Sequence, residues 1–129
     1  DHEIAHREFF KNALGSNAIP GLEVDFSMIN FTSRDSVLAT AKAFEDLGVS
    51  AYNGAGVLIK DANYLTLAGK IVSVEARHAA LIRDLLSNGT FADSVDANAL
   101  DVSKSPNEVL AIAGTYLSSV IDASNLPTS

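Results

Sequence analysis

The chain has 129 residues, 47% of them apolar and 19% charged, which suits one domain with a hydrophobic core and excludes a disordered acidic tail. Its net charge of −7 at pH 7 repels phosphate backbones, so nucleic acid is a poor partner. The absence of cysteine excludes disulfides, thiolate zinc sites, iron–sulfur clusters and cysteine nucleophiles.

Residues 1–14 have the three- and four-residue spacing of a helix, and Gly15 follows as a C-terminal stop. The inward stripe of this helix holds Glu3, His6, Phe10 and Ala13. The chain enters the helical pattern without an initiator methionine, so we expect residues before Asp1. Residues 15–32 contain helix-breaking proline and glycine and alternate loosely between apolar and polar side chains. A strand there would lack a strong pairing partner, so we interpret the segment as an extended crossover.

Two longer helices are predicted over residues 33–59 and 63–88, with a tight turn between them. Thr32 and Asp35 have the spacing of a capping box for the first of these helices. Its inward stripe consists of Leu38, Ala41, Glu45, Gly48, Val49, Tyr52, Ala55, Gly56 and Ile59. The matching stripe of the next helix consists of Leu67, Ala68, Ile71, Val74, Glu75, His78, Ile82 and Leu85. The two stripes predict an antiparallel helical hairpin.

The C-terminal part of the chain is predicted to add one more helix. Residues 90–104 read as an irregular acidic loop. A capping box at Ser105–Glu108, with proline at the first helical position, starts a helix that we expect to span 105–122. This helix has a separate amphipathic stripe, so we expect it to pack on the outside of the hairpin as an added element.

The first helix contains His2-Glu3-Ile4-Ala5-His6, which matches the H-E-x-x-H pattern of zinc proteases. The same residues contain Glu3-x-x-His6, the E-x-x-H half-site of a two-metal carboxylate bundle. The protease interpretation needs a third ligand downstream and a sheet edge to hold substrate. Glu23 lies in the crossover rather than on a helix, and no sheet is predicted. We therefore favour the shorter pattern and expect His2 to be incidental.

A second E-x-x-H, Glu75-Ala76-Arg77-His78, supports the shorter pattern. Positions i and i+3 share one face of a helix, so each pair can present a carboxylate and an imidazole to a common point. Glu45 interrupts an apolar stripe, and a carboxylate facing a core is costly unless it is paired or bound to metal. At about 1.5 Å rise per residue, Glu45 and Glu75 lie nearly level across the hairpin. The candidate metal ligands are Glu3, His6, Glu45, Glu75 and His78.

Simpler interpretations of the same residues remain open. Glu75 and His78 could form a surface pair with Arg77, Glu45 could be half-exposed, and His6 could be an ordinary N-terminal histidine. Tyr52, on the stripe of Glu45, could hydrogen-bond a ligand or belong to the core, and we favour the core.

The segments EIAHREFF, AFEDLGVSAYNGAG and IVSVEARHAALIRDLL resemble the ferritin-like superfamily, and more narrowly the family that includes plant and bacterial desiccation-related proteins. The resemblance covers residues 1–88. It implies an all-α, ferritin-like four-helix bundle in a single domain over 1–129, with the bundle core in 1–88 and a loop and extra helix in 89–129. The predicted helices 1–14, 33–59 and 63–88 would match the second, third and fourth bundle helices. The first bundle helix and its glutamate have no counterpart in the chain.

The resemblance implies iron or manganese as the cofactor and oxygen- or peroxide-linked redox chemistry, including ferroxidase-type activity. Glu3 and Glu75 would bridge the metals, His6 and His78 would be nitrogen ligands, and Glu45 would be a terminal carboxylate. Three glutamates supply a charge of −3, which does not balance two divalent ions, so we expect weakened or single-metal occupancy. The alternative is a non-catalytic, stress- or desiccation-associated structural bundle with a degenerate metal site.

Divalent metal ions are thus the expected partners. The sequence contains no run of about 18 apolar residues, so it does not predict a membrane span. The sequence leaves the compartment open, and only the resemblance suggests an extracytoplasmic or periplasmic one. Without a first bundle helix, a groove beside Phe10, Leu38 and Ile82 would be open. We expect a preceding segment or a partner chain, such as a second copy, to fill it in preference to the 105–122 helix.

Overall fold

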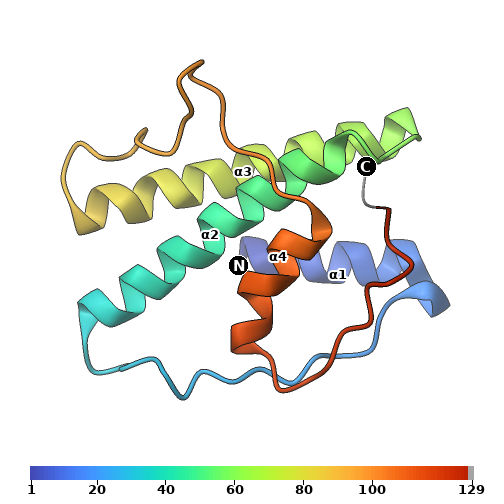
Figure 1. Cartoon of the computed structure of the whole chain (residues 1–129), viewed down its shortest axis with the longest axis horizontal. Helices are drawn as coiled ribbons and strands as arrows, with labels where there is room; N and C mark the ends of the chain where they lie inside the picture. Colours follow the sequence, from blue (N-terminus) through green and yellow to red (C-terminus); the bar gives the residue numbers. More distant parts are fainter. Residues whose placement is uncertain (128–129) are drawn as a thin grey trace.

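Two long antiparallel helices packed side by side form the centre of this computed structural model, which describes residues 1–127 (Figure 1). They are α2 (Arg34–Gly56) and α3 (Ala62–Leu86). The Asp61 carboxylate starts α3 by accepting hydrogen bonds from the backbone N–H groups of Asn63 and Tyr64 at 2.8 and 3.1 Å. The predicted hairpin and the all-α class are confirmed.

The residue that caps α2 differs from the prediction. Ser33 is the N-cap, and its hydroxyl accepts a hydrogen bond from the backbone N–H of Ser36 at 3.3 Å. Thr32 is not available for this role, because its hydroxyl and its backbone N–H both donate to the side chain of Asn30, at 2.7 and 3.0 Å. A local turn before the helix therefore competes successfully for Thr32.

The core of the hairpin is small. Its buried residues are Leu47, Val49 and Ser50 of α2 and Ala68, Ile71, Glu75 and Ala79 of α3. The presence of a glutamate in so small a core is unusual, because burial of an unpaired carboxylate is costly.

The first helix, α1 (His2–Leu14), lies along one side of the hairpin and buries none of its residues (Figure 1). It ends where predicted, at Gly15, whose φ of 53° lies in the left-handed region, and a 3-10 turn η1 (Gly15–Asn17) follows. The crossover then runs back to the start of α2 in extended conformation, as expected (Figure 1).

The last helix, α4 (Pro106–Ala113), packs against α2 and starts with the predicted capping box at Ser105. It is shorter than the predicted 105–122. After a 3-10 turn, η2 (Gly114–Tyr116), the chain becomes extended and Leu117 pairs with Val24 of the crossover in an antiparallel bridge. Three hydrogen bonds of 2.8–2.9 Å flank this bridge.

The composition of the chain after Ala113 explains why α4 ends earlier than predicted. Glycine, threonine, serine and β-branched residues after position 113 have weak helix propensity. The crossover offers their backbone an alternative set of hydrogen bonds, for example from the N–H of Asp25 to the carbonyl of Tyr116. The pairing partner that the sequence did not reveal for the crossover is therefore the C-terminal segment.

The loop before α4 is irregular, as predicted, but it is anchored. Val95 and Asp101 form a second isolated bridge within it. At its end, the backbone N–H of Lys104 donates to the Ser50 carbonyl at 3.0 Å, so the loop docks directly on α2. This close approach requires Gly54, because a Cβ there would lie 1.8 Å from the Lys104 carbonyl oxygen. A cavity of about 510 Å³ remains between the loop and the hairpin.

Much apolar surface stays exposed. The accessible surface is 8867 Å², about one third more than a folded monomer of this mass exposes on average. Of the three side chains expected along an open groove, Phe10 is exposed, and Leu38 and Ile82 are half-buried. That a preceding segment or a partner chain covers this groove stays a prediction. Within residues 1–127, each helix falls short of the length or apolar character needed to cross a membrane.

The docking of the loop at Gly54 can be tested by substitution. We expect Gly54→Ala to destabilise the protein by about 1–3 kcal/mol, because the added methyl group displaces the Lys104 backbone. Gly69→Ala is the matched control: it also lies inside a helix, but in open space, and should stabilise by up to about 1 kcal/mol. Urea unfolding measures both. Equal stabilisation by the two substitutions would contradict the close contact.

Candidate metal centre

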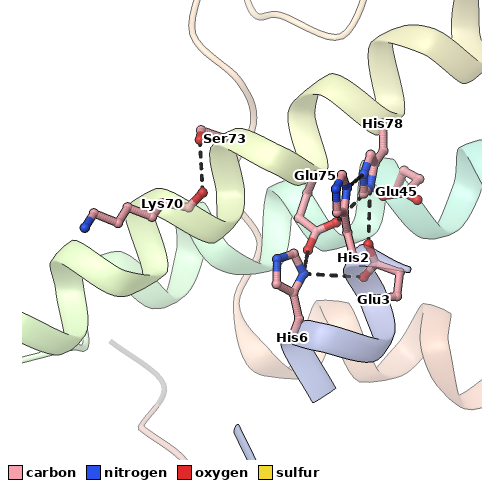
Figure 2. Close-up of polar contacts among 8 residues, drawn as sticks. All are labelled: His2, Glu3, His6, Glu45, Lys70, Ser73, Glu75 and His78. Atoms are coloured by element: carbon pink, nitrogen blue, oxygen red, sulfur yellow. Dashed lines mark hydrogen bonds and ion pairs between the residues drawn. The ribbon is translucent and has the colours of Figure 1, made fainter. Parts of the chain in front are cut away.

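Three helices bring the predicted ligands to one place (Figure 2). α1 contributes Glu3 and His6, α2 contributes Glu45, and α3 contributes Glu75 and His78. In both α1 and α3 the glutamate and histidine are three residues apart, so they lie on the same face of their helix. The near-level positions of Glu45 and Glu75 follow from the antiparallel packing of α2 and α3.

His78 lies at the centre of four clustered residues. Its Nδ1 atom is 3.2 Å from Oε1 of Glu3, 3.5 Å from Oε2 of Glu45 and 3.5 Å from Oε2 of Glu75. One potential ligand atom of each of these four residues lies within 4.8 Å of the others. Carboxylate oxygens and an imidazole nitrogen at such distances are a donor set that can hold a divalent cation.

His6 is the second histidine of the site, and two of the carboxylates lie close to it. Its Nδ1 atom is 3.1 Å from Oε1 of Glu75 and 3.8 Å from Oε2 of Glu3. Glu3 and Glu75 therefore each direct one oxygen toward His6 and the other toward His78, whereas Glu45 faces His78. The carboxylates of Glu3 and Glu75 thus lie between two imidazoles.

The Nδ1 atom of His6 is buried and has no hydrogen-bond partner, although Glu75 is close. The contact is short, but its angles do not fit a hydrogen bond. A buried polar atom without a partner costs free energy. A cation between the nitrogen lone pair and the carboxylate oxygen would satisfy both atoms, so the residues present fit a metal ion.

Exposure rises steadily across the site. The side chain of Glu75 is 7% exposed, those of His6 and Glu45 are 19% exposed, and that of Glu3 is 59% exposed. A cavity of about 240 Å³ opens beside Glu3, Glu45 and His78. The site therefore has a buried floor at Glu75 and an opening at Glu3.

The electrostatics reflect the crowding of carboxylates. Burial is the main cause that raises the pKa of Glu45 to about 7, and the charges of Glu75 and Glu3 raise it further, while His78 opposes them. Burial, followed by the same two carboxylates, raises the pKa of Tyr52 to about 12. The Tyr52 phenol is half-buried and therefore stays protonated near the site.

His2 is not incidental to the geometry. Its Nδ1 atom lies 2.9 Å from Nε2 of His78 (Figure 2). The H-E-x-x-H pattern was the signal that could have found it, since His2 precedes His6 by one helical turn. The protease interpretation gains no support, because His2 and His6 have different partners and residues 1–127 contain isolated bridges but no strand.

The structure thus places all five predicted site residues in one cluster of side chains. That they bind a metal stays a prediction. A family model described as a ferritin-like domain matches residues 1–88, which include the whole of α1, α2 and α3. Comparison with curated proteins and with solved structures yields no match.

The raised pKa of Glu45 predicts a pH dependence of stability in the metal-free protein. Its pKa in the folded state is about 7, above the ordinary 4.5, so the folded state retains a proton that the unfolded state releases. The free energy of unfolding should therefore fall as the pH rises from about 5 to about 8. Glu45→Gln should remove this loss and raise the Tm at pH 8 by about 3–6 °C, with little change at pH 5.

Thermal unfolding followed by circular dichroism in the presence of a chelator measures this difference. Asp93→Asn, which alters an exposed carboxylate outside the cluster, is the control and should change Tm equally at both pH values. The same Tm difference between Glu45→Gln and wild type at pH 5 and pH 8 would contradict the assignment.

Proposed function

Because this chain belongs to the ferritin-like domain family, we propose that it binds a divalent metal, iron or manganese, through Glu3, His6, Glu45, Glu75 and His78. The observation that carries the proposal is the buried, unpartnered Nδ1 atom of His6 beside a carboxylate oxygen of Glu75. If Nδ1 of His6 carries a lone pair, a cation between it and the carboxylate oxygen would satisfy both atoms.

The charge of the site supports the same proposal. Three carboxylates contribute −3 when all are ionised, and within residues 1–127 no lysine or arginine forms an ion pair with any of them. A partly buried group of like charges without a counter-charge is unfavourable. A divalent metal supplies that counter-charge, and mixed carboxylate and imidazole donors without thiolate suit iron or manganese.

The contacts suggest a role for each ligand. Glu3 and Glu75, which face both histidines, would bridge two metal positions, while His6 and His78 would each serve one of them. Glu45 would be a terminal ligand on the side of His78. Three carboxylates surround His78 and two surround His6, so the His78 position would bind a metal more tightly. One divalent ion leaves a charge of −1, whereas two leave +1, which favours single occupancy.

A bound iron or manganese ion would supply oxygen- or peroxide-linked redox chemistry, including ferroxidase-type oxidation. The part of the protein in this chemistry is to hold and orient the metal. Glu75 anchors the ligands in the core, and the opening beside Glu3 admits small solutes.

The second candidate is a non-catalytic structural bundle, associated with stress or desiccation, whose metal site is degenerate. The three-carboxylate charge count favours it, because such a site holds a second metal weakly. In that case a single bound ion would act as a structural link between α1 and the hairpin.

Metal titration tests the proposal. We expect the wild-type chain to bind one Mn²⁺ or Fe²⁺ tightly under anaerobic conditions, and Glu75→Gln to weaken binding at least about tenfold. The control is Glu8→Gln, on the same helix as Glu3 but paired with Arg7 outside the cluster. If Glu75→Gln and Glu8→Gln bind metal equally, the site is elsewhere.

Oxygen consumption separates the two candidate functions. If the redox proposal holds, the Fe²⁺-loaded wild-type chain should consume oxygen faster than the same iron with Glu75→Gln. Binding of Fe²⁺ without faster oxygen consumption would instead favour the structural bundle. A chain that neither binds Fe²⁺ nor consumes oxygen would refute the redox proposal and leave the structural bundle with a degenerate site.

A further inference from the structure

The imidazole of His78 has a second nitrogen, Nε2, that meets Nδ1 of His2 at 2.9 Å. The two ring planes differ by only 7°, and the ring centroids are 5.2 Å apart. Because a ring nitrogen lies only one ring radius from its centroid, these two distances agree only if both nitrogens lie near the line that joins the centroids. The rings are therefore nearly coplanar and share a straight hydrogen bond (Figure 2).

The proposed metal centre determines the direction of this hydrogen bond. A bond between two neutral imidazoles needs one N–H donor and one lone pair. A metal ligand at Nδ1 of His78 must carry a lone pair there, so the proton of His78 lies on Nε2. That N–H then donates to Nδ1 of His2, whose own proton lies on its Nε2 atom.

We propose that His2 is a positioning residue for the metal centre. By accepting the proton on Nε2, it holds His78 in the tautomer and ring orientation that direct Nδ1 toward Glu3, Glu45 and Glu75. This inference rests on the proposed function. Ligand histidines are commonly fixed by such a partner on their other nitrogen, and loss of the partner typically weakens metal binding about 10–100-fold.

The surroundings of His78 leave His2 as the partner for this role. The side chain of His78 is 25% exposed and lines, together with His2, a cavity of about 240 Å³. A water molecule could replace His2 as an acceptor but would not restrain the plane of the ring. The side chain of His2 is exposed, so its removal should cost little packing energy. An effect of His2 substitution on metal binding would therefore not arise from unfolding.

Two substitutions separate the hydrogen bond from size and charge. His2→Asn keeps an acceptor oxygen close to the position of Nδ1, whereas His2→Phe keeps a flat ring and has no acceptor. Both variants lack the imidazole charge. We expect Mn²⁺ titration of the full chain, followed by electron paramagnetic resonance of free Mn²⁺, to show weaker binding by His2→Phe by about tenfold. His2→Asn should bind within about twofold of wild type, and all three metal-free proteins should share the same Tm.

Each outcome decides the inference. Rescue by asparagine but not by phenylalanine supports an accepting partner. Equal Mn²⁺ binding by all three proteins overturns the role of His2 and leaves the metal centre intact. Equal weakening by both substitutions also overturns it, because the acceptor would then be irrelevant. No Mn²⁺ binding by wild type overturns the metal proposal together with the role of His2.

Discussion

The structure depends on how the protein accommodates three carboxylates against one side of a two-helix hairpin. Glu75 is 5% exposed in a core of five small or medium apolar side chains. Burial, together with the nearby charges of Glu75 and Glu3, raises the pKa of Glu45. So small a core has little free energy with which to oppose carboxylate repulsion. In the proposed metal-bound protein the ion would supply the counter-charge, so metal binding and the folding of the chain would be coupled.

The attachment of α1 depends on the same site. This helix buries none of its residues, and its polar contacts with the hairpin all involve the cluster: Glu3 and His2 meet His78, and His6 meets Glu75. An element held mainly by such contacts is expected to be among the first to open. A metal shared by α1 and the hairpin would join them, so ligand binding and the docking of α1 are one event in the proposed site.

The parts that the sequence could predict are local or follow from one regular geometry. The E-x-x-H spacing, the capping box at Ser105 and the level positions of Glu45 and Glu75 each need only helical periodicity, and the structure has all three arrangements. The contact of His2 with His78 and the bridge between Val24 and Leu117 join residues far apart in the chain. Such pairs depend on how whole elements pack, which periodicity does not encode. For the same reason the predicted α4 was too long. The hydrogen bonds that replace helical ones after Ala113 come from the crossover, which is far away in the sequence.

Exposure increases from Glu75 to Glu3, so the site has a buried side and a side that faces solvent. The candidate ligands of the hairpin, Glu45, Glu75 and His78, are supported by the best-packed part of the molecule. Glu3 is the most exposed candidate ligand and lies on α1, which buries none of its residues. Glu45, Glu75 and His78 would therefore hold a metal from the hairpin, and Glu3 and His6 would hold it from α1. His2, on the same helix, would contact Nε2 of His78 while Glu3 contacts Nδ1. His2, Glu3 and His6 lie within about one turn of α1, so all three would make their contacts with the hairpin when α1 docks.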